Sequence, residues 1–115
     1  MLPRDSRTMA RLQELVTALI ERRVASSLVD VETALARWRE GSLSALGAHG
    51  AVLRHAARCE RAVEQVTAAA TDRPEGVLRD AVDVGLMPEP EFVALTGVAV
   101  ETVERITKII EKYNY

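Results

Sequence analysis

Apolar residues in the first third of the chain recur at the spacing of a helix. From residue 24 onward they stand at Val24, Leu28, Val31, Leu35 and Trp38. Steps of four and three residues put all of them on one side of a helix, as a narrow heptad stripe. Asp5 or Ser6 can cap a helix start, and Gly41 stands where a left-handed terminating residue is favoured. The pattern therefore predicts one long helix over residues 6–40, or a fresh helix capped at Ser27.

A second apolar stripe with the same rhythm follows. Its positions are Val52, Ala56, Cys59, Val63 and Val66. Gly47 and Gly50 each cost about 1 kcal/mol inside a helix. Residues 43–50 are therefore either a turn or a helix whose glycines permit a close crossing. Two long helices joined by a short connection predict an antiparallel hairpin, which we assign to residues 1–72.

The two stripes are too narrow for a lone pair of helices to bury much surface. A second copy of the chain could cover the apolar side chains that a lone pair of helices leaves exposed. We therefore expect the stripes to form the seam of a homo-oligomer, with a dimer favoured as a four-helix bundle. Docking of the hairpin on the C-terminal part of the same chain is the alternative.

Residues 73–115 predict a small subdomain of three helices. Pro74 suits the first turn of a helix that ends at Gly85. A second helix follows Met87 and ends at Gly97, and a third runs from about residue 100 to 113. Aromatic residues make up only 3% of the chain, and no aromatic run favours a strand. The fold class is therefore all-α: a long, coiled-coil-like antiparallel hairpin followed by a small three-helix C-terminal subdomain.

Residues 92–110, which read FVALTGVAVETVERITKII, resemble the helix-turn-helix of bacterial regulators. By this resemblance Gly97 forms the turn, Val98 enters the core, and Val103 and Ile106 hold the second helix on its neighbour. The resemblance further implies a set of side chains facing the major groove of DNA: Glu101, Thr102, Arg105 and Lys108.

Charge argues against DNA as the preferred partner of this segment. Residues 73–115 carry five basic and eight acidic side chains, whereas DNA readers gain most of their affinity by neutralising phosphates. Val93 also replaces the small residue that usually packs between the two helices. A three-helix module that docks a protein is therefore favoured over a DNA reader.

Composition and charge indicate the compartment in which the protein is expected and the ligands that are not expected. The whole chain has a formal net charge of −2, so a general phosphate-binding surface is not expected. Its single cysteine, Cys59, cannot form an internal disulfide, which favours a reducing compartment. The first residues lack the apolar core of a secretory signal, and no apolar run is long enough to span a membrane. We expect a cytoplasmic protein without membrane contact.

The candidate chemical groups are few. His55 and Cys59 stand four residues apart on one helix face near His49, but a metal site needs a third or fourth ligand. A buried cysteine with surface histidines is the better interpretation. Arginines next to glutamates are interpreted as solvated faces, with steering of a partner or nucleic acid along the helices as the alternative. Trp38 is expected as a core anchor, or, if exposed, as a partner contact.

The sequence thus predicts a non-enzymatic interaction or scaffold protein. It would form oligomers through the hairpin and bind a macromolecular partner, most simply a protein, through the C-terminal module. No catalytic, cofactor-binding or metal-binding residue is assigned. A small dimeric DNA-binding regulator of the helix-turn-helix type is the alternative.

Overall fold

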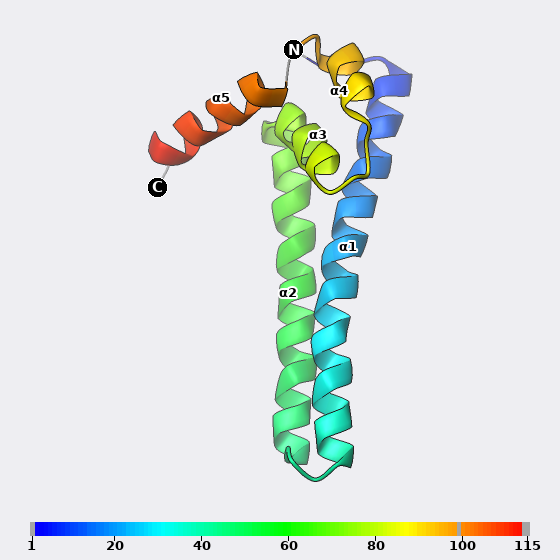
Figure 1. Ribbon diagram of the computed structural model, residues 1–115, viewed down its shortest axis with the longest axis vertical. Coiled ribbons are helices and arrows are strands. Elements are labelled where there is room, and N and C mark those ends of the chain that lie inside the picture. Colours follow the sequence, from blue (N-terminus) through cyan, green and yellow to red (C-terminus); the bar gives the residue numbers. More distant parts are fainter. Residues whose placement is uncertain (1, 99, 114–115) are drawn as a thin grey trace. The chain divides into compact units, whose positions relative to one another are not determined.

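The chain is built from helices. The computed structural model describes residues 2–98 and 100–113, without the side chains of residues 100–102, 104, 107 and 113. Its helices are α1 (Ser6–Arg39), α2 (Ala45–Asp72), α3 (Pro74–Asp83), α4 (Glu89–Thr96) and α5 (Val100–Tyr113) (Figure 1). Two long helices followed by three shorter ones confirm the predicted fold class.

The first helix is continuous and ends where the sequence predicted. Asp5 caps it, because a carboxylate oxygen of Asp5 accepts a hydrogen bond from the backbone N–H of Thr8 at 2.8 Å. Gly41 adopts a φ of 83° just beyond the C-terminus, a conformation that glycine reaches without steric cost. The alternative of a second helix start at Ser27 is wrong, since Ser27 lies inside α1.

The second helix starts at Ala45 and includes both glycines, so the turn alternative for residues 43–50 is wrong beyond Ser44. Ser44 acts as the cap, its hydroxyl accepting a hydrogen bond from the backbone N–H of Gly47 at 3.0 Å. Gly47 leaves room for Leu43, because an added Cβ would lie 2.6 Å from a methyl carbon of Leu43. The glycine therefore serves local packing at the start of the helix.

The contacts divide the chain into two compact units. We call Met1–Ala18 with Val66–Tyr115 the terminal unit, and Leu19–Gln65 the hairpin unit. The boundary at residue 72 expected from sequence differs from this division. The first turns of α1 and the last turns of α2 belong with the three short helices, because they carry core residues such as Leu15 and Val66.

The terminal unit has a core of large hydrophobic side chains. Helix α3 contacts both α4 and α5, and α4 contacts α5. The largest fully buried side chains are those of Phe92, Leu15, Leu78 and Val77. Within this unit Arg11 links α1 to α4, since its guanidinium donates two hydrogen bonds to the Glu91 carboxylate, at 2.9 and 3.0 Å. These bonds raise the pKa of Arg11.

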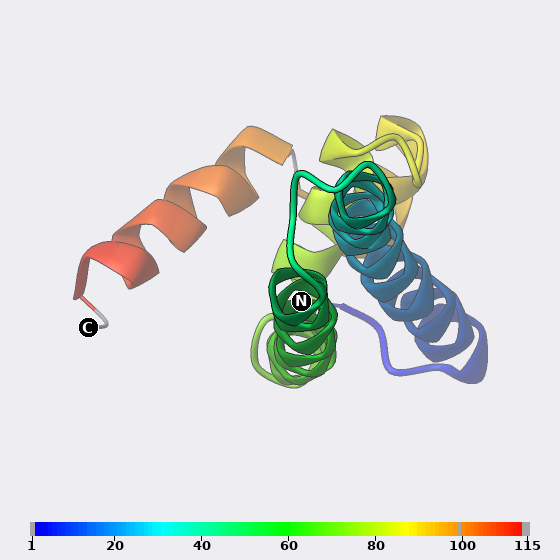
Figure 2. The same ribbon diagram turned by 90° about the horizontal axis from the view of Figure 1, so that it is seen from below.

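The hairpin unit is held by small side chains. In it α1 and α2 run side by side in opposite directions (Figures 1 and 2). Its buried residues are Ser27, Ala34, Ala48, Ala51 and Ala62. Small residues let two helix backbones approach closely, but they bury little apolar area. The hairpin unit therefore has far less core of its own than the terminal unit.

Candidate functional site

Small and polar residues make the contact between α1 and α2. Ser27 and His55 meet across it, with the hydroxyl oxygen 2.8 Å from Nδ1 of the ring. One turn further along, Arg58 donates to Asp30 at 2.7 Å. Arg23 donates to the side-chain oxygen of Gln65 at 3.1 Å. Together with the buried alanines, these pairs define which side of each helix faces the other.

Most residues of the two apolar stripes predicted from the sequence directly follow a residue that takes part in this helix–helix contact. In α1, Leu28 follows Ser27; in α2, Val52 follows Ala51 and Val63 follows Ala62. One residue turns a helix by about 100°. The stripes therefore lie beside the contact between the two helices, and small and polar residues make that contact.

Both stripes point to the same side of the hairpin. In each helix, the step from a contact residue to the next residue rotates the side chain about the helix axis in the same sense along the chain. Because the two helices run in opposite directions, these two rotations bring both stripes to the same face of the hairpin. We call this surface the apolar face. Val24, Val31, Leu35 and Cys59 are half-buried on it, and Ala56 is exposed. The larger side chains Leu28, Val52 and Val63 are 44%, 42% and 47% exposed.

Two residues of the predicted seam behave differently from the rest. Val66 is buried and belongs to the terminal unit. It therefore packs within the terminal unit of the single chain, and its place in an oligomer seam stays a prediction. Trp38 is 46% exposed within the single chain, so the expected burial as a core anchor is not seen there. Its alternative role as a partner contact stays a prediction.

His55 and Cys59 are neighbours on α2. The Cys59 sulfur lies 3.5 Å from Nε2 of His55, and the same ring also meets Ser27. The imidazole thus takes part in the helix–helix contact. Both side chains are half-buried and His49 is exposed. Among the described residues, no group of three or more His, Cys, Asp or Glu is placed to hold a metal ion.

Gly97 ends α4 with a left-handed backbone conformation. Gly97 has a φ of 72° and its N–H donates to the carbonyl of Val93 at 2.8 Å. The Thr96 hydroxyl donates to the Phe92 carbonyl at 2.9 Å. Because only a residue tolerant of positive φ fits at position 97, this glycine sets the sharp change of chain direction.

Helix α5 is only partly packed against the neighbouring helices. Val103 is buried, whereas Ile106 is 53% exposed and therefore contributes less to holding α5. Ile109 is exposed as well. Among the predicted DNA contacts, Arg105 and Lys108 are exposed, and Lys108 already makes an interaction within the chain. The side chains of Glu101 and Thr102 lie outside the described residues.

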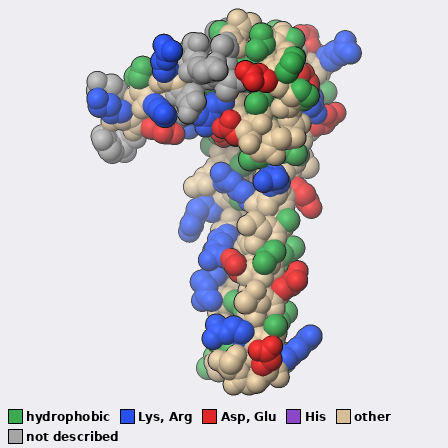
Figure 3. Space-filling model, in the orientation of Figure 1, with side chains coloured by type: hydrophobic (Ala, Val, Ile, Leu, Met, Phe, Trp, Pro, Cys, Tyr) green, Lys and Arg blue, Asp and Glu red, His purple; other side chains and the backbone are tan. Residues whose placement is uncertain are grey.

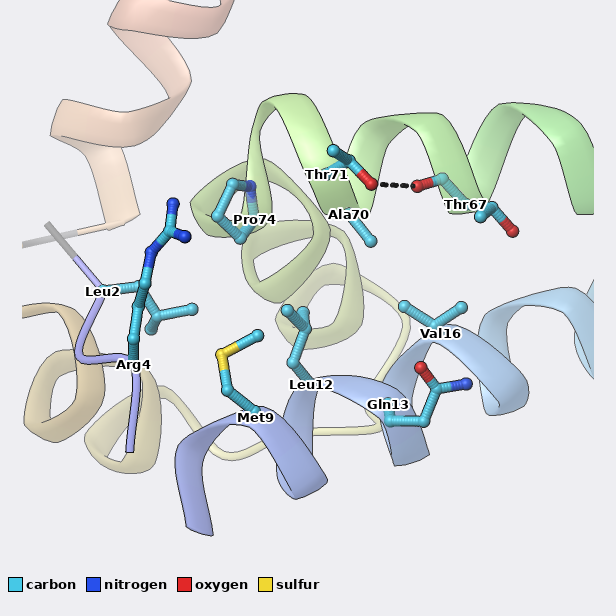
Figure 4. Close-up of a pocket in the computed structure, with 10 residues that line it drawn as sticks. All are labelled: Leu2, Arg4, Met9, Leu12, Gln13, Val16, Thr67, Ala70, Thr71 and Pro74. Atoms are coloured by element: carbon cyan, nitrogen blue, oxygen red, sulfur yellow. Dashed lines mark hydrogen bonds between the residues drawn. The ribbon is translucent and has the colours of Figure 1, made fainter. Parts of the chain in front are cut away.

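The terminal unit also contains a hollow that the sequence did not predict. It measures about 390 Å³ and lies between the first turns of α1 and the junction of α2 and α3 (Figure 4). Its apolar wall is formed by Leu2, Met9, Leu12, Val16, Ala70 and Pro74. Arg4, Gln13, Thr67 and Thr71 supply its polar part. The nearest sequence signal is the run of apolar positions at the start of α1, which includes Leu12 and Val16.

Comparisons with other proteins give no further guide to function. No protein-family model, no curated protein sequence and no solved structure matches this chain. None of the helices in the described part of the chain is long and apolar enough to cross a membrane.

Proposed function

We propose that this chain is a non-enzymatic interaction protein that forms homo-oligomers through the apolar face of its hairpin. The single observation that carries the proposal is the position of the two heptad stripes. They lie together on one side of the hairpin, while small residues close the contact between α1 and α2. We place the assembly in the cytoplasm, where a lone cysteine stays reduced.

A second copy is the occupant that the apolar face suits best. Both helices present apolar residues at the same heptad spacing, so two such faces can interdigitate as a four-helix bundle. A symmetric dimer needs a surface that is complementary to itself, and a face built from two similar antiparallel stripes meets that condition. Complete burial of one Leu or Val side chain contributes about 1.5–3 kcal/mol, so several partly exposed ones can hold a dimer.

The C-terminal helix supplies a surface for a different partner. Ile106 and Ile109 are exposed on α5, three residues apart and on the same side of the helix. An amphipathic helix of this kind commonly binds an apolar groove on another protein. We therefore propose that the oligomer displays α5 helices to a protein partner.

Substitution on and off the apolar face tests the oligomer. Leu28→Glu puts a charge on the face, whereas Val29→Glu places the same charge on the next residue, which is 58% exposed and lies off the face. We expect light scattering to report a discrete oligomer for the wild type and for Val29→Glu, and a monomer for Leu28→Glu. A monomeric wild type, or equal masses for the two variants, would contradict the proposal.

The alternative function is a dimeric DNA-binding regulator. The left-handed Gly97 turn and the exposed Arg105 favour it. In that case α5 would enter the major groove and Arg105 would contact a base edge, typically of guanine. Sequence-selective duplex binding that is lost in Arg105→Ala would support this candidate, and its absence at low salt would exclude it.

A further inference from the structure

The side of the hairpin that carries the contact pairs is rich in arginine. Two hollows, of about 260 and 470 Å³, lie along the hairpin unit. Arg23, Arg58 and Arg61 line the first, and Arg37, Arg54 and Arg58 line the second. Arg58 and Asp30 border both hollows, so the two follow one another along the hairpin unit, and we call the surface that they form together the arginine groove. Figure 3 shows Lys and Arg side chains gathered along the hairpin.

The positive charge of the groove is largely uncompensated. Asp30 is the acidic residue among those that line it, and Arg58 already pairs with it at 2.7 Å. Arg23 donates to the uncharged side chain of Gln65. Within the described part of the chain, the guanidinium groups of Arg37, Arg54 and Arg61 make no ion pair or hydrogen bond. Four guanidinium groups are therefore left to bind an external anion, which would relieve their mutual repulsion.

The lining of the groove also indicates the kind of anion. Apart from Leu43 its apolar residues are alanines, and no aromatic side chain lines either hollow. A protein partner would normally need an apolar centre in the interface. A single-stranded nucleic acid would normally need aromatic rings for base stacking. A groove with neither feature suits a repeated phosphate, recognised by charge alone.

The arginines are spaced over a length that fits a duplex backbone. Arg23 and Arg37 lie fourteen residues apart on α1, which corresponds to about 21 Å along the helix axis. B-form DNA carries one phosphate for about every 1.7 Å of its axis when both strands are counted. Several phosphates of a duplex therefore fall within the length of the groove. We propose that the arginine groove binds the phosphate backbone of a nucleic-acid duplex without reading its sequence.

This proposal does not depend on the oligomer. The arginine groove and the apolar face lie on different sides of the hairpin, so pairing of two copies leaves the groove open. It also differs from the helix-turn-helix alternative, in which Arg105 of α5 makes the decisive contact. Substitutions in the groove, outside it and on α5 can therefore separate the three ideas.

Duplex binding as a function of salt tests the groove. The probe is a fluorescent random-sequence 20-base-pair DNA duplex, titrated with the full chain from 50 to 200 mM salt. With four or five phosphate contacts, the slope of log K against log salt should be about −4. The double variant Arg54→Gln/Arg61→Gln should lower the size of that slope by about two and weaken binding at 50 mM salt by one to two orders of magnitude, roughly.

The controls remove arginine charge outside the groove, two charges in one variant and one charge in the other. Arg22→Gln/Arg39→Gln removes two exposed arginines that line neither hollow, and Arg105→Gln removes the candidate base contact. Both should bind with nearly the wild-type slope. Circular dichroism and light scattering would check that every variant keeps its helices and its mass.

Three results would overturn the proposal. The first is an absence of duplex binding at 50 mM salt. The second is equal loss in the groove variant and in the Arg22→Gln/Arg39→Gln control, which would show a general charge effect. The third is stronger binding of poly-glutamate or of single-stranded DNA than of the duplex, which would assign the groove to an acidic protein segment or to a single strand.

Discussion

At the scale of single residues, glycine and serine decide how the hairpin turns and how α2 begins. Gly41 takes a positive φ after α1, and Ser44 supplies the hydroxyl that accepts the N–H of Gly47. The sequence identified Gly41, because few residues tolerate that conformation. Ser42 also stands at the turn, but its hydroxyl donates to the carbonyl of Arg37 at 3.2 Å and does not cap α2.

Two glycines in the first turns of α2 give a matched pair of substitutions. An added Cβ at Gly47 would lie 2.6 Å from a methyl carbon of Leu43, whereas at Gly50 its nearest neighbour is a guanidinium nitrogen of Arg54 at 3.3 Å. Alanine favours a helix over glycine by about 1 kcal/mol. We expect Gly50→Ala to raise the free energy of unfolding by up to about that amount.

Gly47→Ala should gain less, or lose stability, because Leu43 must move to make room for the methyl group. Chemical denaturation of both variants under the same conditions measures the difference. If Gly47→Ala were the more stable of the two, Leu43 would not be packed against the glycine as described.

At the scale of elements, the amphipathic pattern predicted the helices well but not their contacts. The heptad stripes were read correctly as apolar sides of α1 and α2. Which side closes the hairpin was not evident, because Ser27, Ala34 and Ala51 give no strong apolar signal. Such residues form the contact because their small size permits close approach, a property that a hydrophobicity pattern does not report.

The start of α1 carries a prediction about pH. Hydrogen bonds from the Thr8 backbone N–H, and secondly from its hydroxyl, lower the pKa of Asp5 below 3.8. A carboxylate with a lowered pKa stabilises the folded chain above its unfolded value, and this contribution is lost as the pH falls through the folded pKa. We therefore expect the first turn of α1 to loosen only in acid, below about pH 3.8.

A carboxyl titration followed by nuclear magnetic resonance checks this cap. Thr8→Val removes the hydroxyl and keeps the N–H, so the pKa of Asp5 should rise only part of the way. Asp5→Asn retains an acceptor oxygen and should remove the pH dependence of the first turn. A wild-type Asp5 that titrates at or above 3.8 would contradict the cap.

At the scale of the whole molecule, the two units differ in how much core each contains. The terminal unit encloses Phe92, Leu15 and Leu78, whereas the buried side chains of the hairpin unit are alanines and one serine. Free energy from burial scales with apolar area. The hairpin unit therefore needs the proposed second copy for its stability far more than the terminal unit does.

Hydrogen exchange measures this difference. Amides of residues 19–65 should exchange faster on dilution of the wild-type protein, and faster again in Leu28→Glu, because both changes separate the copies. Amides in the core of the terminal unit, such as those of α3, should be nearly indifferent to concentration. Equal sensitivity in the two units would argue against an oligomer held by the hairpin.

The amino-acid sequence by itself determined the helices, most of their ends and the existence of two apolar stripes. These features depend on local spacing, on caps such as Asp5 and on glycine conformation, all of which act within one or two turns. The tertiary structure decided which residues close the hairpin, that both stripes share a face, and that Val66 is covered while Trp38 is not. It also brought arginines from α1 and α2 into one groove. Those outcomes depend on how one helix is rotated against another, and no local pattern contains that angle.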